Sequence, residues 1–319
     1  MTNQSDSFEV ILVGFPGLPQ HLHGLVSAMM FLIYMTSLAA NGSVIGLVTL
    51  NPRLHQPMYL LIANLAASDV LFDTITLPKL IARYWFGSST IAFKVCVFQM
   101  FWIHHLGSLD SFLLLLMAID RYVAISQPLR YGAIINNRTV IIACGFCWVF
   151  LAPSTKIFHA IEAFKIALCE VNNKINTLYC SHAAIAALSC GDAAHMKQVA
   201  FISAMVVLLV PLSLILFSYI MIITVIARSK SSANWQKAFY TCGTHLFLVA
   251  LYYVLRIFVY IVTNIPVIVI KADVNAVLLF LYSIAPHVGS PFVYFLRTKE
   301  IRQTVRKVFQ KLKVVISVF

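Results

Sequence analysis

Charged residues are scarce in this chain of 319 residues, and their scarcity excludes a fold in water. Lys, Arg, Asp and Glu make up 11% of the sequence, whereas hydrophobic residues make up 61% and the mean hydropathy is +0.88. The apolar residues form runs long enough to cross a bilayer as helices, which takes about 20 residues each. The chain is therefore predicted to be an integral membrane protein.

The alternating apolar and polar pattern of a transmembrane barrel is missing. Backbone N–H and C=O groups in lipid must form hydrogen bonds within the protein. Helices are expected because each helix pairs its own backbone groups. A cleavable leader is missing too, because residues 1–24 are polar and carry Asp6 and Glu9. We expect the first span to act as its own insertion signal.

Acidic residues are few, 11 against 23 basic ones, and the formal net charge is +12. Such an excess can indicate a nucleic-acid partner. Here, however, the cations lie in short loops between apolar spans and in the carboxyl-terminal tail, so the excess is first a topology signal. No nucleic acid is expected as a partner.

Seven apolar spans predict an all-α fold, an integral membrane bundle of seven transmembrane helices. The spans cover residues 25–50, 58–82, 95–123, 140–158, 199–227, 239–265 and 274–296. Residues 1–319 form one domain, with an outer tail at 1–24, the bundle at 25–296 and a cytoplasmic tail at 297–319. That last tail is basic and amphipathic, which suits a helix lying on anionic lipid.

The loop charges decide which end of the bundle faces the cytoplasm. One side gathers fourteen cations against two acids, Asp120 and Glu300. The other side has eight cations, Lys156 among them, against seven acids, Asp73 among them. Cytoplasmic loops carry the excess of Lys and Arg, so the first side is cytoplasmic. The amino terminus is then extracellular and the carboxyl terminus cytoplasmic.

Cysteine placement agrees with this topology, because disulfides belong to the oxidising side of a membrane. Four of the seven cysteines fall at the outer ends of spans or in the long outer loop: Cys96, Cys169, Cys180 and Cys190. Four cysteines allow three pairings, and the spacing leaves all three open. On the same side, Asn3 begins an Asn-Gln-Ser triplet that is a candidate N-glycosylation acceptor.

Three polar residues lie deep inside the predicted spans. Asp110, Asp69 and Asn41 are each roughly 15 to 18 Å from the cytoplasmic surface at 1.5 Å per helical residue. Two carboxylates at one depth would repel each other, so either one holds a proton or a cation lies between them. A sodium ion suits an all-oxygen site. The alternative is a hydrogen-bonded, water-filled packing layer.

Five sequence motifs resemble those of one protein family. Residues 117–131 read MAIDRYVAISQPLRY, and the others are PMYL with SD at 57–69, SY at 218–219, KAFYTCGTHL at 237–246, and SPFVY with LRTKEI at 290–301. In this order they closely resemble the signatures of the odorant receptors, a branch of the rhodopsin-like G-protein-coupled receptors. The phrase GFPGL at 14–18 resembles the branch tuned to water-soluble ligands. The departures are Ser290 for the usual Asn, Ile119 for Tyr, and Leu255 for the sixth-span kink proline.

The resemblance implies roles for particular residues at the cytoplasmic end and in the buried layer. Asp120, Arg121, Tyr122 and Tyr219 would couple to a heterotrimeric G protein, with Arg121 released from Asp120 on opening. Sodium would bind at Asp69 and Asp110. The implied disulfides are Cys96 with Cys180 and Cys169 with Cys190. The protein would be a non-enzymatic receptor in the cell membrane, in sensory cilia, that raises cyclic AMP through the stimulatory olfactory G protein.

Arg256 is the cation placed deepest in a predicted span, and it should point inward because a cation facing lipid is costly. It could bind an anionic odorant. The alternatives are a salt bridge to Glu162, Glu170 or Asp192, or a place among the neighbouring tyrosines. The expected small-molecule site is lined by Ile103, His104, Gly107, Ser108, Ser203, Val207, Tyr253, Arg256, Tyr260 and Ser283. A metal site from His104 and His105 is not expected, since adjacent residues point apart.

Two other functions compete with an odorant receptor. One is a rhodopsin-like receptor outside olfaction. The other is a transporter or channel, since buried acids and an inward arginine also occur in ion pathways. Against transport, the sequence has no repeated half and no pair of interrupted spans. An enzyme is not supported, because the sequence has neither a metal-spaced histidine cluster nor a glycine-flanked serine nucleophile.

Overall fold

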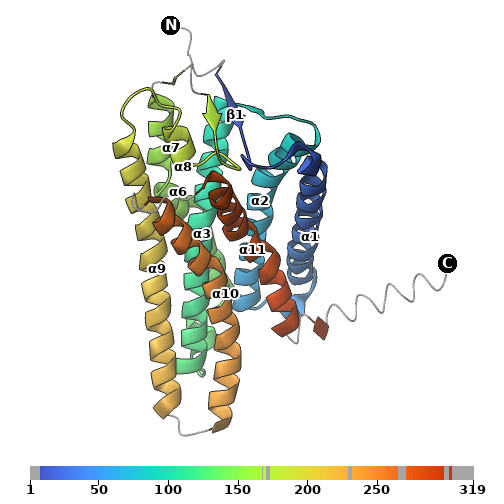
Figure 1. The fold of residues 1–319 in the computed structure, drawn as a ribbon. Helices are drawn as coiled ribbons and strands as arrows, with labels where there is room; N and C mark the ends of the chain where they lie inside the picture. Colours follow the sequence, from blue (N-terminus) through green and yellow to red (C-terminus); the bar gives the residue numbers. More distant parts are fainter. Residues whose placement is uncertain are drawn as a thin grey trace, which may run out of the picture.

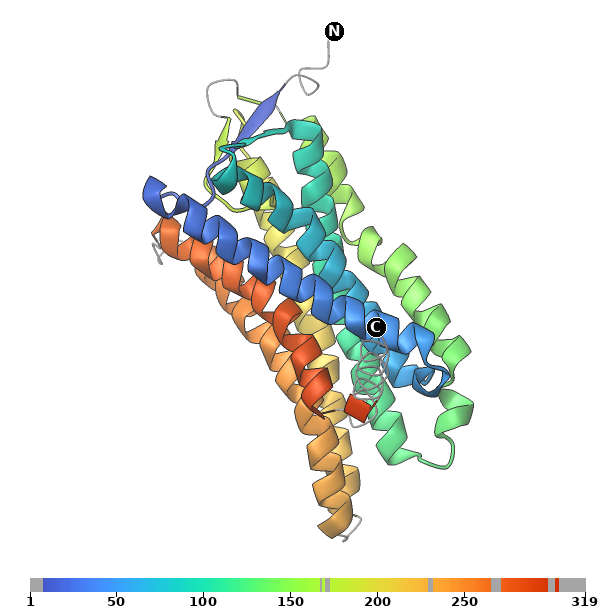
Figure 2. The same ribbon diagram turned by 90° about the vertical axis from the view of Figure 1, so that its right-hand side faces the viewer.

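The computed structural model describes residues 8–166, 168–169, 173–228, 232–264, 271–297 and 302–303. Long helices lie side by side in a bundle, with a small sheet at the amino-terminal end (Figures 1 and 2). Six helical segments of the described chain are long and apolar enough to cross a membrane. The seventh long helix, α3, carries Asp110, Asp120 and Arg121 and runs through the bundle against α2, α9 and α10.

The long helices agree with the seven predicted spans and extend most of them by a few residues. They are α1 (His23–Leu50), α2 (Pro57–Trp85), α3 (Phe93–Ser126), the broken fourth span of α5 (Asn137–Phe146), α6 (Ala152–Ser154) and α7 (Ile157–Lys165), then α9 (Ala194–Arg228), α10 (Ser232–Asn264) and α11 (Ala272–Arg297). Short helices are α4 (Tyr131–Ile134), α8 (His182–Ala186) and the 3-10 turns Gln20–Leu22 and Pro52–Leu54.

Local sequence explains where several helices begin. Pro57 occupies the first turn of α2, where its missing N–H leaves no intrahelical bond unmade. The side chain of Asn136 accepts a hydrogen bond of 3.0 Å from the backbone N–H of Thr139 and caps α5. Ser181 caps α8 in the same way through Ala184 N–H.

The fourth span is not one regular helix. A π turn at Cys147–Leu151 follows α5, and α6 ends at Ser154 before α7 starts at Ile157. A π turn holds one residue more than an α turn and rotates the faces that follow it. Lys156 lies at the break and is only 4% exposed. The sequence analysis counted Lys156 among the charges of the outer side. The structure places it in the outer half of the bundle, but buried within the fourth span and not in a loop.

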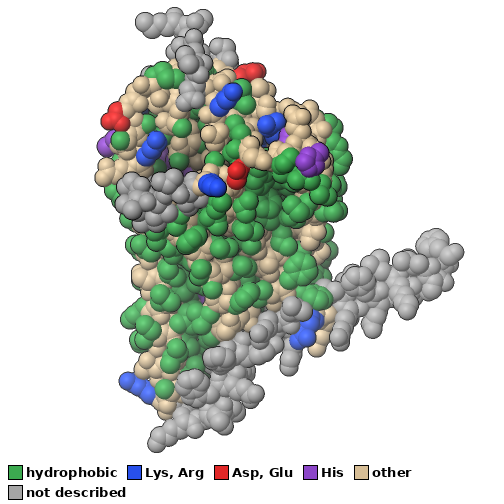
Figure 3. All heavy atoms as spheres, in the orientation of Figure 1, with side chains coloured by type: hydrophobic (Ala, Val, Ile, Leu, Met, Phe, Trp, Pro, Cys, Tyr) green, Lys and Arg blue, Asp and Glu red, His purple; other side chains and the backbone are tan. Residues whose placement is uncertain are grey.

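The outside of the bundle is apolar, as lipid requires. Hydrophobic side chains cover the middle of the face in Figure 3, and the visible charged side chains lie toward the two ends. Exposed apolar residues include Leu25, Leu32, Ile141, Ile142, Val149, Phe217, Ile220 and Val254. The polar residues of the spans are turned inward instead. Asp73, which was also counted as an outer charge, is fully buried in α2.

An extracellular cap departs from the expectation of a plain tail and loop. Strand β1 (Glu9–Leu12) lies between β2 (Thr90–Ala92), to which it is antiparallel, and β3 (Lys174–Ile175), to which it is parallel. Below this sheet, a second apolar core gathers residues of β1, α3, α7 and α8. The structure joins Cys96 to Cys180 and Cys169 to Cys190, so the long loop is tied to α3 and to itself.

Three predictions lie outside the described residues. These are the glycosylation acceptor at Asn3, the acid Glu170, and the amphipathic tail at 297–319 apart from its first residue and residues 302–303.

Candidate functional site

The buried polar layer predicted from Asp69 and Asp110 exists, and Asp69 is its best-bonded carboxylate. Tyr252 of α10 donates its hydroxyl to both carboxylate oxygens, at 2.8 and 3.0 Å. Ser290 of α11 donates to the same carboxylate at 3.0 Å. Asp69 thus connects α2 to α10 and α11. Ser290, which the sequence analysis counted as a departure from the resembled signature, forms a hydrogen bond to the layer.

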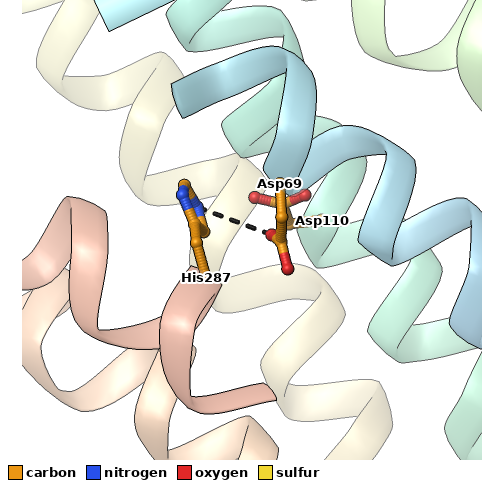
Figure 4. A group of neighbouring side chains, drawn as sticks. All are labelled: Asp69, Asp110 and His287. Atoms are coloured by element: carbon orange, nitrogen blue, oxygen red, sulfur yellow. Dashed lines mark ion pairs between the residues drawn. The ribbon is translucent and has the colours of Figure 1, made fainter. Parts of the chain in front are cut away.

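His287 of α11 lies between two carboxylates of α2 and was missed by the sequence analysis. Its Nδ1 is 2.7 Å from Asp73. Its Nε2 is 3.6 Å from Asp69, a pair drawn in Figure 4 together with Asp110. The contact with Asp73 is a hydrogen bond, whereas the Nε2 atom is too far from Asp69 for one. Asn41 donates to the backbone carbonyl of His287 at 2.9 Å, and Ser37 donates to Asp73 at 2.5 Å, so α1 joins the layer as predicted for Asn41.

Arg256 is held by α3, and neither of the two outer-loop acids that the structure describes, Glu162 and Asp192, forms an ion pair with it. One guanidinium nitrogen, Nη2, is 3.7 Å from the Asp110 carboxylate, and Nη1 donates to the carbonyl of Gly107 at 2.9 Å. Asp110 also accepts a hydrogen bond of 2.6 Å from Ser68. The guanidinium lies against the Gly107 backbone, and a Cβ at that position would be in ordinary contact with it, 3.4 Å from Nη1. Of the acids proposed as partners, Glu162 instead lies 3.8 Å from His159.

A sodium ion does not fit this layer well. Asp69, Asp110 and His287 each offer one ligand atom, and these three atoms lie within 4.8 Å of one another. The group is compact enough to hold an ion. Sodium, however, is a hard cation that prefers oxygen ligands. The third donor here is an imidazole, and Arg256 already places a cationic group beside the Asp110 carboxylate. Sodium stays a prediction of the sequence, and these side chains argue against it.

The cytoplasmic end of α3 has the expected ion pair. Arg121 lies 2.9 Å from Asp120, which is 1% exposed at its side chain. Tyr131 of α4 donates to the other carboxylate oxygen of Asp120 at 2.6 Å. Burial and the Asp120 carboxylate raise the pKa of Tyr131, so its hydroxyl remains a donor at neutral pH. Tyr122 is half-buried against the core.

Tyr219 of α9 also has a partner that the sequence analysis missed. Its hydroxyl is 2.5 Å from Nδ1 of His245 on α10, and the two rings stack with centroids 5.8 Å apart. The contact joins α9 to α10 near the Asp120–Arg121 pair. Tyr131 and His245 both lie within sequence motifs that resemble the family, at 117–131 and 237–246. That position could have indicated that the two residues are functional.

Two adjoining cavities lie in the outer half of the bundle. The larger, of about 300 Å³, is lined by residues of the outer loop, α9, α10 and α11. The smaller, of about 40 Å³, reaches down to Gly107 and Arg256. Both share walls formed by His104, Lys156, Ala204, Tyr260 and Tyr282. Cavities of this kind between helices are usual sites for small ligands.

Most predicted ligand residues line one of these cavities. Those in the walls are Ile103, His104, Gly107, Ser108, Val207, Arg256 and Tyr260. Three others lie nearby without lining either one. Ser203 accepts a hydrogen bond from Lys156, Ser283 bonds to Tyr179, and Tyr253 is buried in the core. Lining residues that were missed include Lys156, Tyr179, His182 and Tyr282.

This arrangement defines the class of the protein: a seven-helix bundle with an ion pair at the inner end of its third helix, a buried polar layer and an outer cavity. It is the fold of the rhodopsin-like G-protein-coupled receptors. Squid rhodopsin superposes with a TM-score of 0.71 at 16% identity, covering 92% of this chain and 87% of that chain.

The chain belongs to the olfactory receptor family, whose sequence profile matches residues 30–312. It is 33% identical to "Olfactory receptor 1E16" of Mus musculus over 98% of both chains. It is 32% identical to "Olfactory receptor 1A1" of Homo sapiens over 97% of both. The protein is therefore a multi-pass cell-membrane receptor for small molecules that couples to a G protein, and it is not an enzyme.

Proposed function

We propose that the two outer cavities form the odorant site and that an odorant bound there activates the stimulatory olfactory G protein, which raises cyclic AMP. The protein would act in the ciliary membrane of sensory neurons. The observation that carries the proposal is the position of Arg256. Its side chain lines the smaller cavity and also contacts Asp110, so one residue connects the ligand space with the buried layer.

The route from the cavity to the cytoplasm follows α3. Gly107 and Asp110, which hold Arg256, lie on the same helix as Asp120 and Arg121. A ligand that shifts Arg256 changes the contacts between α10 and α3. Near the inner end of the bundle, Asp120 pairs with Arg121, and Tyr219 contacts His245. In our proposal these contacts belong to the closed state of the inner face. A ligand that favours an open state shifts the population toward it only by its difference in affinity for the two states.

The sixth helix needs no proline for such a change. α10 carries Tyr252 and Arg256 one turn apart, and these two side chains hold it to Asp69 and Asp110. Polar contacts that exchange partners can move a straight helix as a rigid body. We expect α10 to move as one piece about this layer.

A reconstitution experiment tests the proposal. The receptor in lipid vesicles is mixed with stimulatory, olfactory-class G-protein heterotrimer, and guanine nucleotide exchange is followed while carboxylic acids, amines and neutral alcohols are added. We expect at least one class to accelerate exchange several-fold, and the same class to raise cyclic AMP in cells. Acceleration with inhibitory heterotrimer alone would refute the G-protein class, and ligand-dependent ion flux without exchange would refute receptor function.

A further inference from the structure

The cavities contain a buried cation that has no carboxylate partner among the described residues. Lys156 is 4% exposed, and its ammonium donates to the hydroxyl of Ser203 on α9 at 3.3 Å. The ion pairs in the described part of the chain involve Arg121, Arg256, His159 and His287, but not Lys156. A buried charge is stable only when it is paired or well hydrogen-bonded.

Arg256, by contrast, is already compensated. It contacts Asp110 and the Gly107 carbonyl, and its guanidinium carbon lies 5.9 Å from the ring centroid of Tyr282. An anionic ligand at Arg256 would have to compete with Asp110. An anionic ligand at Lys156 would compete only with a neutral hydroxyl.

The surroundings of Lys156 can complete an anion site. His182 faces the larger cavity with both ring nitrogens buried and without a hydrogen-bond partner in the structure, and Nε2 of His104 is in the same state. The two rings stack with centroids 4.2 Å apart. Burial, together with His104, His159 and Lys156, lowers the pKa of His182 well below its usual value. A neutral imidazole N–H can donate to an anion without adding charge.

Apolar side chains line much of both cavities and leave room for a hydrocarbon tail. Phe72, Ile103, Val207 and Leu208 line the smaller cavity, and Phe201 and Leu279 line the larger one. The larger cavity also has polar side chains in its wall: Thr177, Ser181, Lys197, Thr263 and Asn275. An ammonium with one hydroxyl beside it suits a monoanion better than a phosphate dianion, which usually takes several cations.

We infer that Lys156 anchors a small monocarboxylic acid, with its carboxylate on the Lys156 ammonium and its hydrocarbon tail along the apolar walls. The inference rests on the proposed use of these cavities as the odorant site, and it moves the anion contact from Arg256 to Lys156. The break between α6 and α7 is the local feature that turns Lys156 inward.

Binding to the purified full-length receptor in lipid nanodiscs tests the inference directly. The probes are straight-chain carboxylic acids of four to eight carbons, and their primary amides serve as uncharged controls of the same shape. Binding is read from the rise in the thermal unfolding midpoint with probe concentration. The variants are Lys156→Met, which keeps the length without the charge, Lys156→Arg, which keeps the charge, and Lys165→Met, which removes an exposed cation from the same span.

We expect acids to bind the wild type and Lys165→Met alike and to bind Lys156→Met at least about tenfold more weakly, the scale of a lost charge-assisted hydrogen bond. Lys156→Arg should retain part of the affinity, and amide binding should be the same in all variants. If Lys156→Met does not fold, Lys156→Gln takes its place. Equal binding of acids to the uncharged variant, or no binding of acids to the wild type, overturns the inference.

The same preparation separates this inference from the proposed function. Nucleotide exchange driven by neutral compounds, with no acid binding, would leave the receptor proposal standing and reject the role of Lys156. Acid binding that depends on Lys156, without any nucleotide exchange, would support the role of Lys156 and reject the proposed receptor function.

Discussion

Arg256 on α10 and Asp110 on α3 form a fully buried ion pair at 3.7 Å, and Arg256 is fixed further by the Gly107 carbonyl on the same helix as Asp110. The pair therefore connects the sixth and third spans beside the smaller outer cavity.

Removing one partner of this pair should destabilise the receptor more than removing both. Arg256→Met leaves the Asp110 carboxylate buried without its cation, which typically costs about 3 to 5 kcal/mol. Arg256→Met combined with Asp110→Asn should recover most of that loss, because neither charge remains. Unfolding midpoints in detergent measure the cycle, with Arg138→Met as an exposed arginine control. Additive losses in the combined variant would show that the two residues do not interact.

Sodium should have little effect on the receptor, because His287 and Arg256 already lie beside the carboxylates where the ion would bind. Replacing sodium with choline at constant ionic strength should leave basal nucleotide exchange unchanged. A clear rise in basal exchange on removing sodium, lost in Asp110→Asn, would show that the ion does bind between Asp69 and Asp110 and that the side-chain cations do not replace it.

The inner ion pair should restrain basal activity. Asp120→Asn removes the charge that holds Arg121 at 2.9 Å, so the open state gains population and basal exchange rises several-fold. Tyr131→Phe removes only the 2.6 Å hydrogen bond to the Asp120 carboxylate, so it should raise basal exchange less. Exchange without ligand, normalised to surface expression, measures both. Unchanged basal exchange in Asp120→Asn would exclude the restraint.

Acid should destabilise the extracellular cap through His182. Its pKa is lowered by burial and by His104, His159 and Lys156, so the unfolded chain takes up a proton that the folded chain does not. This contribution to stability is complete above the unfolded pKa of about 6.5 and falls as the pH drops, by up to about 1.4 kcal/mol per pH unit. His182→Asn should flatten the decline of the unfolding midpoint below pH 6.5, while His195→Asn, exposed at the start of α9, should not. An equal slope in both variants would exclude His182 as the source.

The sequence predicted the features that follow from local pattern. Apolar length located the spans, loop charge oriented them, and the depth of Asp69 and Asp110 along their helices predicted a common layer. The partners of that layer could not be predicted, because they depend on how α2, α3, α10 and α11 turn toward one another. His287 and Asp73 could have been noticed by the rule applied to Asp110, since each is an ionisable residue inside a predicted span.

The inward direction of the Lys156 side chain could not be predicted from the sequence, for a different reason. Its distance from the end of the fourth span is visible in the sequence, but its direction depends on the π turn at Cys147–Leu151 and on the break after Ser154. Periodicity assumes one regular helix, so it assigns the wrong face beyond an irregular turn. The small sheet was missed for a related reason, because its strands are too short to show alternation and come from three distant segments.

The central position of β1 also sets an order of events during synthesis. Ile11 is among the first residues to leave the ribosome, yet its parallel partner Lys174 is made more than 160 residues later, after the first four spans. Cys96 must likewise wait for Cys180, 84 residues further on. The extracellular sheet and its neighbouring disulfide are therefore assembled late, between chain segments already delivered to the lumen of the endoplasmic reticulum. A receptor whose fourth span inserts poorly is expected to carry an unpaired strand and reduced thiols there.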